Sequence, residues 1–128
     1  MTTPDERPRS KFGRSTADGC TFWWVDRLWD LSAHLPPFRL PIDRIAEFDM
    51  DCWFEGQESP TCRAVARHAK RIAAVDLSYP VILDTSGELM DGAHRVAKAW
   101  TQGQDWVLAV QFETDPEPDW TEIASASP

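Results

Sequence analysis

A strand, a turn, a second strand and a helix are predicted in succession over residues 80–100, and this run constrains the fold more than any other feature. Val-Ile-Leu at 81–83 and Glu-Leu-Met at 88–90 have the composition of strands, and the Asp-Thr-Ser-Gly between them that of a turn. An Asp-Gly pair ends the second strand, and a helix is expected over 93–102. The sequence therefore predicts a hairpin that leads directly into a helix N-terminus.

The start of that predicted helix has the composition of a phosphate site. His94 and Arg95 fall in the first turn, where cations oppose the helix dipole unless an anion is bound. Gly92 would let the backbone approach such an anion, the free amides of the first turn would face it, and Arg95 could hold two of its oxygens. The alternative is an ordinary turn with exposed His94 and Arg95, and the spacing alone does not choose between the two.

The rest of the chain alternates between helical and extended patterns. Helices are expected over 21–33 and 60–75, and strands over 38–42 and 106–112. The predicted fold class is α+β, or mixed α/β, with a small mixed sheet flanked by helices. The expected core consists of Leu40, Ile42, Val65, Ile72, Val81, Ile82, Leu83, Leu89, Val96, Trp100, Val107 and Val110.

Length and composition indicate one domain. The chain has 128 residues, of which 42% are hydrophobic, and this suffices for a core without disulfides or metal. We expect a flexible N-terminal segment at 1–19, a single domain at 20–113, and an acidic, proline-rich tail at 114–128, with both ends mobile or loosely docked.

Charge and cysteine content narrow the partners and the compartment. The net charge of −8 has the wrong sign for a protein that neutralises DNA phosphates, so no duplex DNA partner is expected. No apolar run approaches the roughly 20 residues of a membrane span, so no membrane partner is expected. An odd number of cysteines without a C-x-x-C pair is typical of reduced thiols, and a cytoplasmic location is expected.

The segment from Phe38 to Phe112 resembles the ParB/sulfiredoxin-like superfamily, which includes the ParB-like nuclease domain family. The resemblance rests on residues 80–84, on the Asp-Gly-Ala-His-Arg of 91–95, on the Val-Ala-Lys-Ala helix that follows, and on the closing strand. In that family, a Gly-x-x-Arg or Gly-x-His-Arg turn before a helix cradles nucleotide phosphates. Members include partition proteins that bind and hydrolyse CTP, ATP-using sulfiredoxins, and a kinase of free serine.

Departures from the family pattern make three of its activities unexpected for this chain: sulfiredoxin chemistry, DNA partition and nuclease activity. Sulfiredoxins carry a nucleophilic cysteine at the position of Ala93, so sulfiredoxin chemistry is not expected here. Partition proteins continue into a helix-turn-helix DNA reader, whereas this sequence ends soon after the domain. The chain also lacks the basic track that nuclease activity would need.

The resemblance therefore implies a small, stand-alone domain that binds nucleotide phosphates and acts as a Mg²⁺-dependent phosphotransferase or nucleotide hydrolase. The implied cofactors are a nucleotide (ATP, ADP or CTP) and Mg²⁺. The expected nucleotide-binding residues are Gly92, Ala93, His94, Arg95 and Lys98, the expected catalytic residues Asp91 and His94, and the expected metal ligands Asp91, Asp49 and Asp51. The alternative is a non-catalytic protein-interaction or regulatory module that keeps the fold. The sequence does not predict the oligomeric state.

Several other side chains have two interpretations. Asp49 and Asp51 either hold Mg²⁺, act as a general base across the site, or belong to a solvated loop. His68 either touches the nucleotide or is a half-buried core histidine, and Trp53 either packs in the core or stacks on a base. The basic residues of the predicted second helix either bind a phosphate tail or pair with the acidic segment before them: Arg63, Arg67, Lys70 and Arg71.

Overall fold

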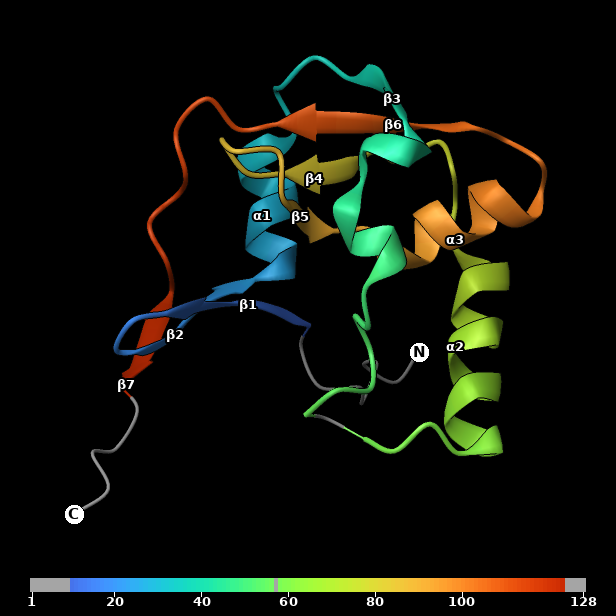
Figure 1. The fold of residues 1–128 in the computed structure, drawn as a ribbon. Helices are drawn as coiled ribbons and strands as arrows, with labels where there is room; N and C mark the ends of the chain where they lie inside the picture. The colour runs from blue at the N-terminus through green and yellow to red at the C-terminus, as the bar shows by residue number, and fades with distance from the viewer. Residues whose placement is uncertain (1–9, 57, 124–128) are drawn as a thin grey trace, which may run out of the picture.

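The computed structural model describes residues 10–56 and 58–123, which form two sheets and three α-helices (Figure 1). Among these residues, no helix is both long and apolar enough to cross a bilayer. In chain order the elements are β1 (Lys11–Thr16), β2 (Gly19–Trp24), α1 (Val25–Ser32), β3 (Phe38–Pro41), the 3-10 turns η1 (Ile42–Arg44) and η2 (Ala46–Asp49), α2 (Cys62–Ala74), β4 (Val81–Leu83), β5 (Leu89–Asp91), α3 (Ala93–Thr101), β6 (Trp106–Gln111) and β7 (Trp120–Ile123).

The central four-stranded sheet has the order β3-β6-β4-β5 and is mixed, because β4 runs parallel to β6 while the other neighbours are antiparallel. Side chains alternate across it as a pleated strand requires. Val81 and Leu83 pack with Val96 and Ala99 of α3, whereas Ile82 packs on the opposite face with Leu28 of α1. The predicted mixed α+β class is therefore confirmed.

Most of the expected core is buried, but two members are exposed. Val65 has 48% of its surface accessible and Trp100 has 61%. Helix α2 turns Ala64 and His68 inward, at a spacing of four residues, and this rotates Val65 toward solvent. Trp100 lies beside Phe48 at the surface, with 6.1 Å between ring centroids.

The helix prediction for 21–33 is wrong in its first four residues, which are extended. Residues 19–24 form β2, and α1 begins only at Val25. β2 lies between β1 and β7 in an antiparallel sheet of order β1-β2-β7, whose hydrogen bonds and aromatic contacts favour the extended backbone. The rings of Phe22 and Trp120 stack there at 5.0 Å.

This second sheet lies in part within the expected end segments. β1 belongs to segment 1–19 and β7 to segment 114–128, so the described part of each end is docked by strand pairing. Pairing with β2 satisfies the backbone groups of each strand that face β2. Residues 1–9 and 124–128 lie outside the described residues.

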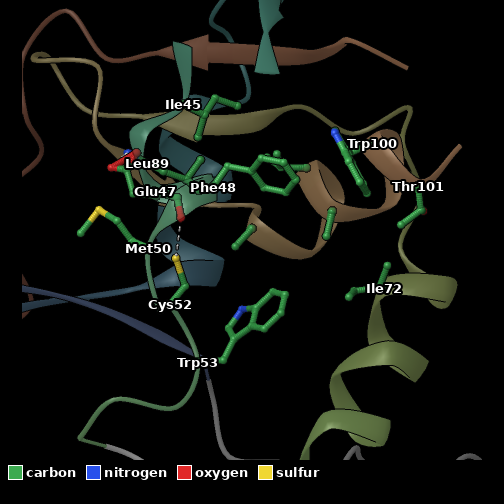
Figure 2. Close-up of a pocket in the computed structure, with 13 residues that line it drawn as sticks. Ile45, Glu47, Phe48, Met50, Cys52, Trp53, Ile72, Leu89, Trp100 and Thr101 are labelled. Carbon is green, nitrogen blue, oxygen red and sulfur yellow. Dashed lines mark hydrogen bonds between the residues drawn. The ribbon is translucent and has the colours of Figure 1, made fainter. Parts of the chain in front are cut away.

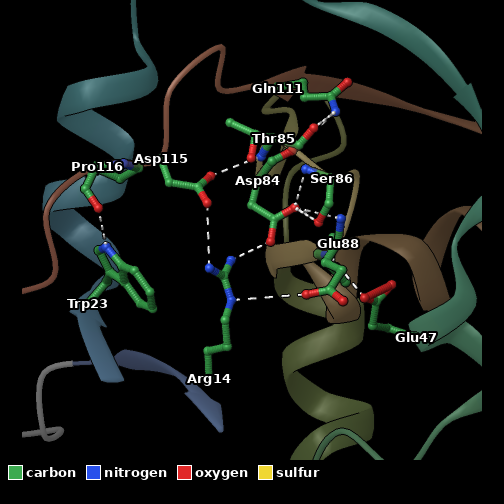
Figure 3. Close-up of polar contacts among 11 residues, drawn as sticks. Arg14, Trp23, Glu47, Asp84, Thr85, Ser86, Glu88, Gln111, Asp115 and Pro116 are labelled. Carbon is green, nitrogen blue, oxygen red and sulfur yellow. Dashed lines mark hydrogen bonds and ion pairs between the residues drawn. The ribbon is translucent and has the colours of Figure 1, made fainter. Parts of the chain in front are cut away.

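Arg14 joins β1 to the turn between β4 and β5 (Figure 3). Its guanidinium donates a hydrogen bond to Asp84, which is only 1% exposed, and forms an ion pair with Asp115 at 3.5 Å. Asp84 also accepts hydrogen bonds from the backbone amides of Ser86 and Glu88, both at 2.9 Å. The network fixes the three-stranded sheet against the central one.

Candidate functional site

The Asp91–Arg95 motif connects β5 to α3, as the sequence predicts, and Gly92 is the residue that makes this connection possible. Its backbone has φ 119° and ψ 17°, in the left-handed region. A Cβ at this position would lie 2.5 Å from Cγ1 of Val81, so only glycine fits. No side chain caps the helix N-terminus. The first-turn amides are therefore left for water or a ligand.

A cleft of about 710 Å³ opens at this helix N-terminus, and we call it the α3 cleft. Its walls come from β1, α1, the segment after η2, the end of α2, and the β5–α3 connection. The residues that line it include Trp29, Glu47, Trp53, Arg71 and 91–95. The structure thus brings Asp91, Gly92, Ala93, His94 and Arg95 to one cavity.

Asp91 and Arg95 are bound to each other and to Trp29. Asp91 Oδ2 accepts a hydrogen bond from Trp29 Nε1 at 2.7 Å and one from Arg95 at 3.4 Å. Arg95 is 8% exposed, donates to the carbonyl of Asp76 at 3.3 Å, and lies 5.2 Å from the centre of the Trp29 ring. Its guanidinium is thus a charged part of the cleft wall that is already engaged.

Three of the expected site residues do not line the cleft. Lys98 Nζ donates to the carbonyls of Ala73 and Val75, at 2.9 and 2.7 Å, and so caps the C-terminus of α2. Asp51 accepts hydrogen bonds from the backbone amides of the two residues that close its own turn. Asp49 is exposed, and no described cluster of three acidic, His or Cys side chains could hold a metal ion. Because Asp49, Asp51 and Asp91 are not brought together, the residues do not fit the expected Mg²⁺ site.

His94 is joined to His68 of α2. His68 Nδ1 and His94 Nε2 are 2.9 Å apart, the rings are within 8° of parallel, and their centroids are 5.1 Å apart. A centroid separation so much longer than the N···N distance means that the two imidazoles meet edge to edge in one plane. His68 Nε2 lies 3.4 Å from Glu58 Oε1. Glu58, His68 and His94 therefore form a continuous polar chain.

Trp53 covers this chain. Its indole is 4.7 Å from the His68 ring and 4.6 Å from the His94 ring, and is within 15° of parallel to both. Nearly equal distances place the indole over the hydrogen bond between the two imidazoles. Figure 2 shows Trp53 between the segment after η2 and helix α2. Trp53 thus restricts the access of water to the histidine pair from that side.

The surroundings of His94 keep its ring neutral. Burial is the largest cause and lowers the pKa of His94 to about 4, with further lowering by the electrostatic influence of the neighbouring His68, Arg71 and Arg95. Cys52 also lines the cleft, but burial and the carboxylates of Glu47 and Asp51 raise the pKa of its thiol. The thiol is therefore protonated, which disfavours a nucleophilic cysteine.

The sequence identified His94 as a site residue but gave no sign of its connection to Glu58. For His68 and Trp53 it did not decide between a site role and a core role. His68 interrupts an otherwise apolar helix face, which was the only signal for it. No family model, curated protein or solved structure matches the chain. The resemblance to the ParB/sulfiredoxin-like superfamily therefore remains a prediction.

Proposed function

We propose that the chain binds the phosphate groups of a nucleotide in the α3 cleft. The observation that carries this proposal is the N-terminus of α3, which no side chain caps and which opens into a cavity that also contains Arg71 and Arg95. Free amides, the positive end of a helix dipole and two guanidinium groups together favour an anion with several oxygens.

The local charge supports an anionic ligand. Arg71 and Arg95 both contribute to the lowered pKa of His94, so the potential at the imidazole is positive. The acidic side chains that line the cleft are engaged elsewhere. Asp91 is bound to Trp29 and Arg95, and Glu47 accepts a hydrogen bond from the amide of Leu89 at 3.0 Å. Because Asp91 and Arg95 offset one another, Arg71 and the N-terminus of α3 supply the positive charge that a phosphate would meet.

The size and lining of the cleft suit a nucleotide better than a free phosphate ion. Its volume of about 710 Å³ lies within the range of small-molecule sites. Trp29 and Trp53 line it and supply aromatic surface against which a base can pack. No cluster within residues 10–56 and 58–123 fits Mg²⁺, so we propose that any Mg²⁺ enters with the nucleotide phosphates.

The proposal is tested by calorimetric titration with ATP, ADP, CTP and GTP, each with and without Mg²⁺. The expected result is binding that Arg71→Ala weakens by about 10- to 100-fold, because a charge-assisted hydrogen bond is lost. Arg63→Ala is the matched control, since Arg63 is exposed on the same helix and does not line the cleft. Absence of binding across the whole panel, or equal weakening by both variants, would contradict the proposal.

A second candidate function, a protein-interaction module, is favoured by a different pocket. An apolar cavity of about 260 Å³ lies between η2, α2 and α3, beside the exposed Trp100 (Figure 2). Exposed apolar surface of this kind is typical of contact with another protein. Retention of a pulled-down partner by Arg71→Ala, with its loss in Trp100→Ala, would support this function over nucleotide binding.

A further inference from the structure

We infer that Glu58, His68 and His94 form a proton relay in which His94 is the general base for the attack of water on a phosphate group in the α3 cleft. This inference rests on the proposed nucleotide site and names the chemistry performed there. Only His94 would touch the reacting atoms, so it is the catalytic residue, and His68 and Glu58 are positioning residues that act through it.

The partners along the chain assign the protons. Glu58 is a carboxylate and can only accept, so it favours a proton on Nε2 of His68, 3.4 Å away. Neutral His68 then has an unprotonated Nδ1, which must accept the hydrogen bond from His94 Nε2. The other nitrogen of His94, Nδ1, then carries an unshared lone pair and can accept a proton. Since Nε2 points at His68, Nδ1 is the nitrogen available to a molecule in the cleft.

The relay moves the positive charge that proton uptake creates from His94 to His68. The ring of His94 is a poor site for charge, because burial and neighbouring cations oppose its protonation. If His94 passes its Nε2 proton to His68 across 2.9 Å while Nδ1 gains one, the charge appears on His68, beside the Glu58 carboxylate. The indole of Trp53 lies over this transfer, and its face favours a cation beneath it.

The surroundings contain other groups that influence the relay. Arg67 also binds Glu58, with 3.3 Å between its guanidinium and Oε2, and so holds the carboxylate in place. The remaining titratable or charged side chains come from the other elements that line the cleft, namely Lys11 on β1, Glu47 and Cys52 near η2, Arg71 on α2, Asp91 on β5 and Arg95 on α3. An anionic phosphate among the cations would lessen their opposition to the proton on His94, so substrate binding itself would prime the base.

The reaction is balanced as hydrolysis of a phosphate anhydride. The water oxygen forms a bond to the terminal phosphorus while one water proton moves to Nδ1 of His94. The bond between that phosphorus and the bridging oxygen breaks, and its electron pair leaves with the shortened nucleotide. The proton held by the relay is then released to solvent. The products are the nucleoside diphosphate and inorganic phosphate, with no oxidant, reductant or other co-reactant.

The first test compares Glu58→Gln with the control Glu55→Gln, an exposed acid of the same segment that does not line the cleft. For each protein, ATP and CTP binding is measured by calorimetry, and phosphate release under single-turnover conditions between pH 5 and 9. Glu58→Gln is expected to bind within about twofold of wild type, to release phosphate about 100-fold more slowly, and to show a shifted pH profile. Glu55→Gln is expected to match wild type.

The outcomes separate the relay from the nucleotide site. Binding by wild type without phosphate release at any pH overturns the hydrolytic relay and leaves the proposed function intact. Release that is equally fast in Glu58→Gln also overturns the relay. Absence of binding in wild type overturns the proposed function and the substrate named here.

A second measurement determines which ring nitrogen of His94 carries the proton, and it needs no substrate. Nitrogen-15 NMR of the histidine rings is expected to show His94 protonated on Nε2 and unprotonated on Nδ1 at pH 7, with this preference lost in His68→Gln. A His94 ring that carries its proton on Nδ1 in wild type would overturn the assignment of the base.

Discussion

Gly92 lies so close to Val81 that a Cβ at position 92 would fall 2.5 Å from Cγ1 of that residue. The backbone at Gly92 is also left-handed. Gly92→Ala is therefore expected to reduce the free energy of unfolding by about 3 kcal/mol, from backbone strain and overpacking together. Gly103→Ala is the matched control, because Gly103 has φ 81° but nothing within 4 Å of the added Cβ. Urea denaturation in which both variants lose the same stability would contradict the packing role of Gly92.

The lowered pKa of His94 makes stability depend on pH with a definite sign. The folded pKa is about 4 and the ordinary value is 6.5, so the unfolded chain binds the proton more tightly than the folded one. Neutral His94 therefore costs the folded state nothing above about pH 6.5. The free energy of unfolding falls as the pH drops from about 6.5 toward 4, because the unfolded chain takes up the proton first. Relative to His94→Asn, wild type is expected to lose about 1–2 kcal/mol between pH 7 and 4, a value reduced for partial solvent exposure. Urea titrations at several pH values measure this difference, and a constant difference would contradict the assignment.

Lys98 is expected to act in folding and not in ligand binding. Its ammonium group donates to two terminal carbonyls of α2, so Lys98→Met should reduce the free energy of unfolding by about 1.5–3 kcal/mol. Nucleotide affinity should remain within about twofold of wild type, because Lys98 does not line the α3 cleft. A selective loss of affinity in a stable variant would restore the role expected from the sequence.

Arg14 is expected to stabilise the contact between the two sheets. Arg14→Met leaves the buried Asp84 without its cationic partner and should destabilise the fold by about 2–4 kcal/mol, somewhat less than a fully buried pair because Arg14 is partly exposed. The double variant Arg14→Met/Asp84→Asn should recover part of this loss, since the unpaired charge is gone. Thermal or urea unfolding measures both, and additive losses would argue against a direct pair.

The hairpin at 81–91 and the helix after it were predictable because their signals are local. Strand composition, a turn of small polar residues and an Asp-Gly pair all lie within one short stretch. β7 could not be predicted in this way, because what orders it is pairing with β2. β1 is joined to β2 by a two-residue turn before Gly19, so its signal was local and was overlooked. β7 is far from β2 in the sequence, and its acidic, proline-containing surroundings favour disorder when they are considered alone.

The site was predictable to the same limited extent. Gly92, Ala93 and His94 were identified from neighbouring residues in the chain, and all three line the cleft. The meeting of His94 with His68 depends on how α2 packs on α3, and no linear spacing encodes it. The prediction for Lys98 was not confirmed. Its nearness to the phosphate motif suggested a ligand-binding role, but the long lysine side chain reaches the C-terminal end of α2 instead.

The central claim is that the α3 cleft binds nucleotide phosphates, and amide NMR during titration with ATP tests it most directly. The account predicts that the largest ¹H–¹⁵N shift changes occur at the amides of Ala93, His94 and Arg95, and that they require far more ATP in Arg71→Ala. Saturating ATP that leaves these three amides unmoved in wild type, or moves only residues outside the cleft, would contradict it.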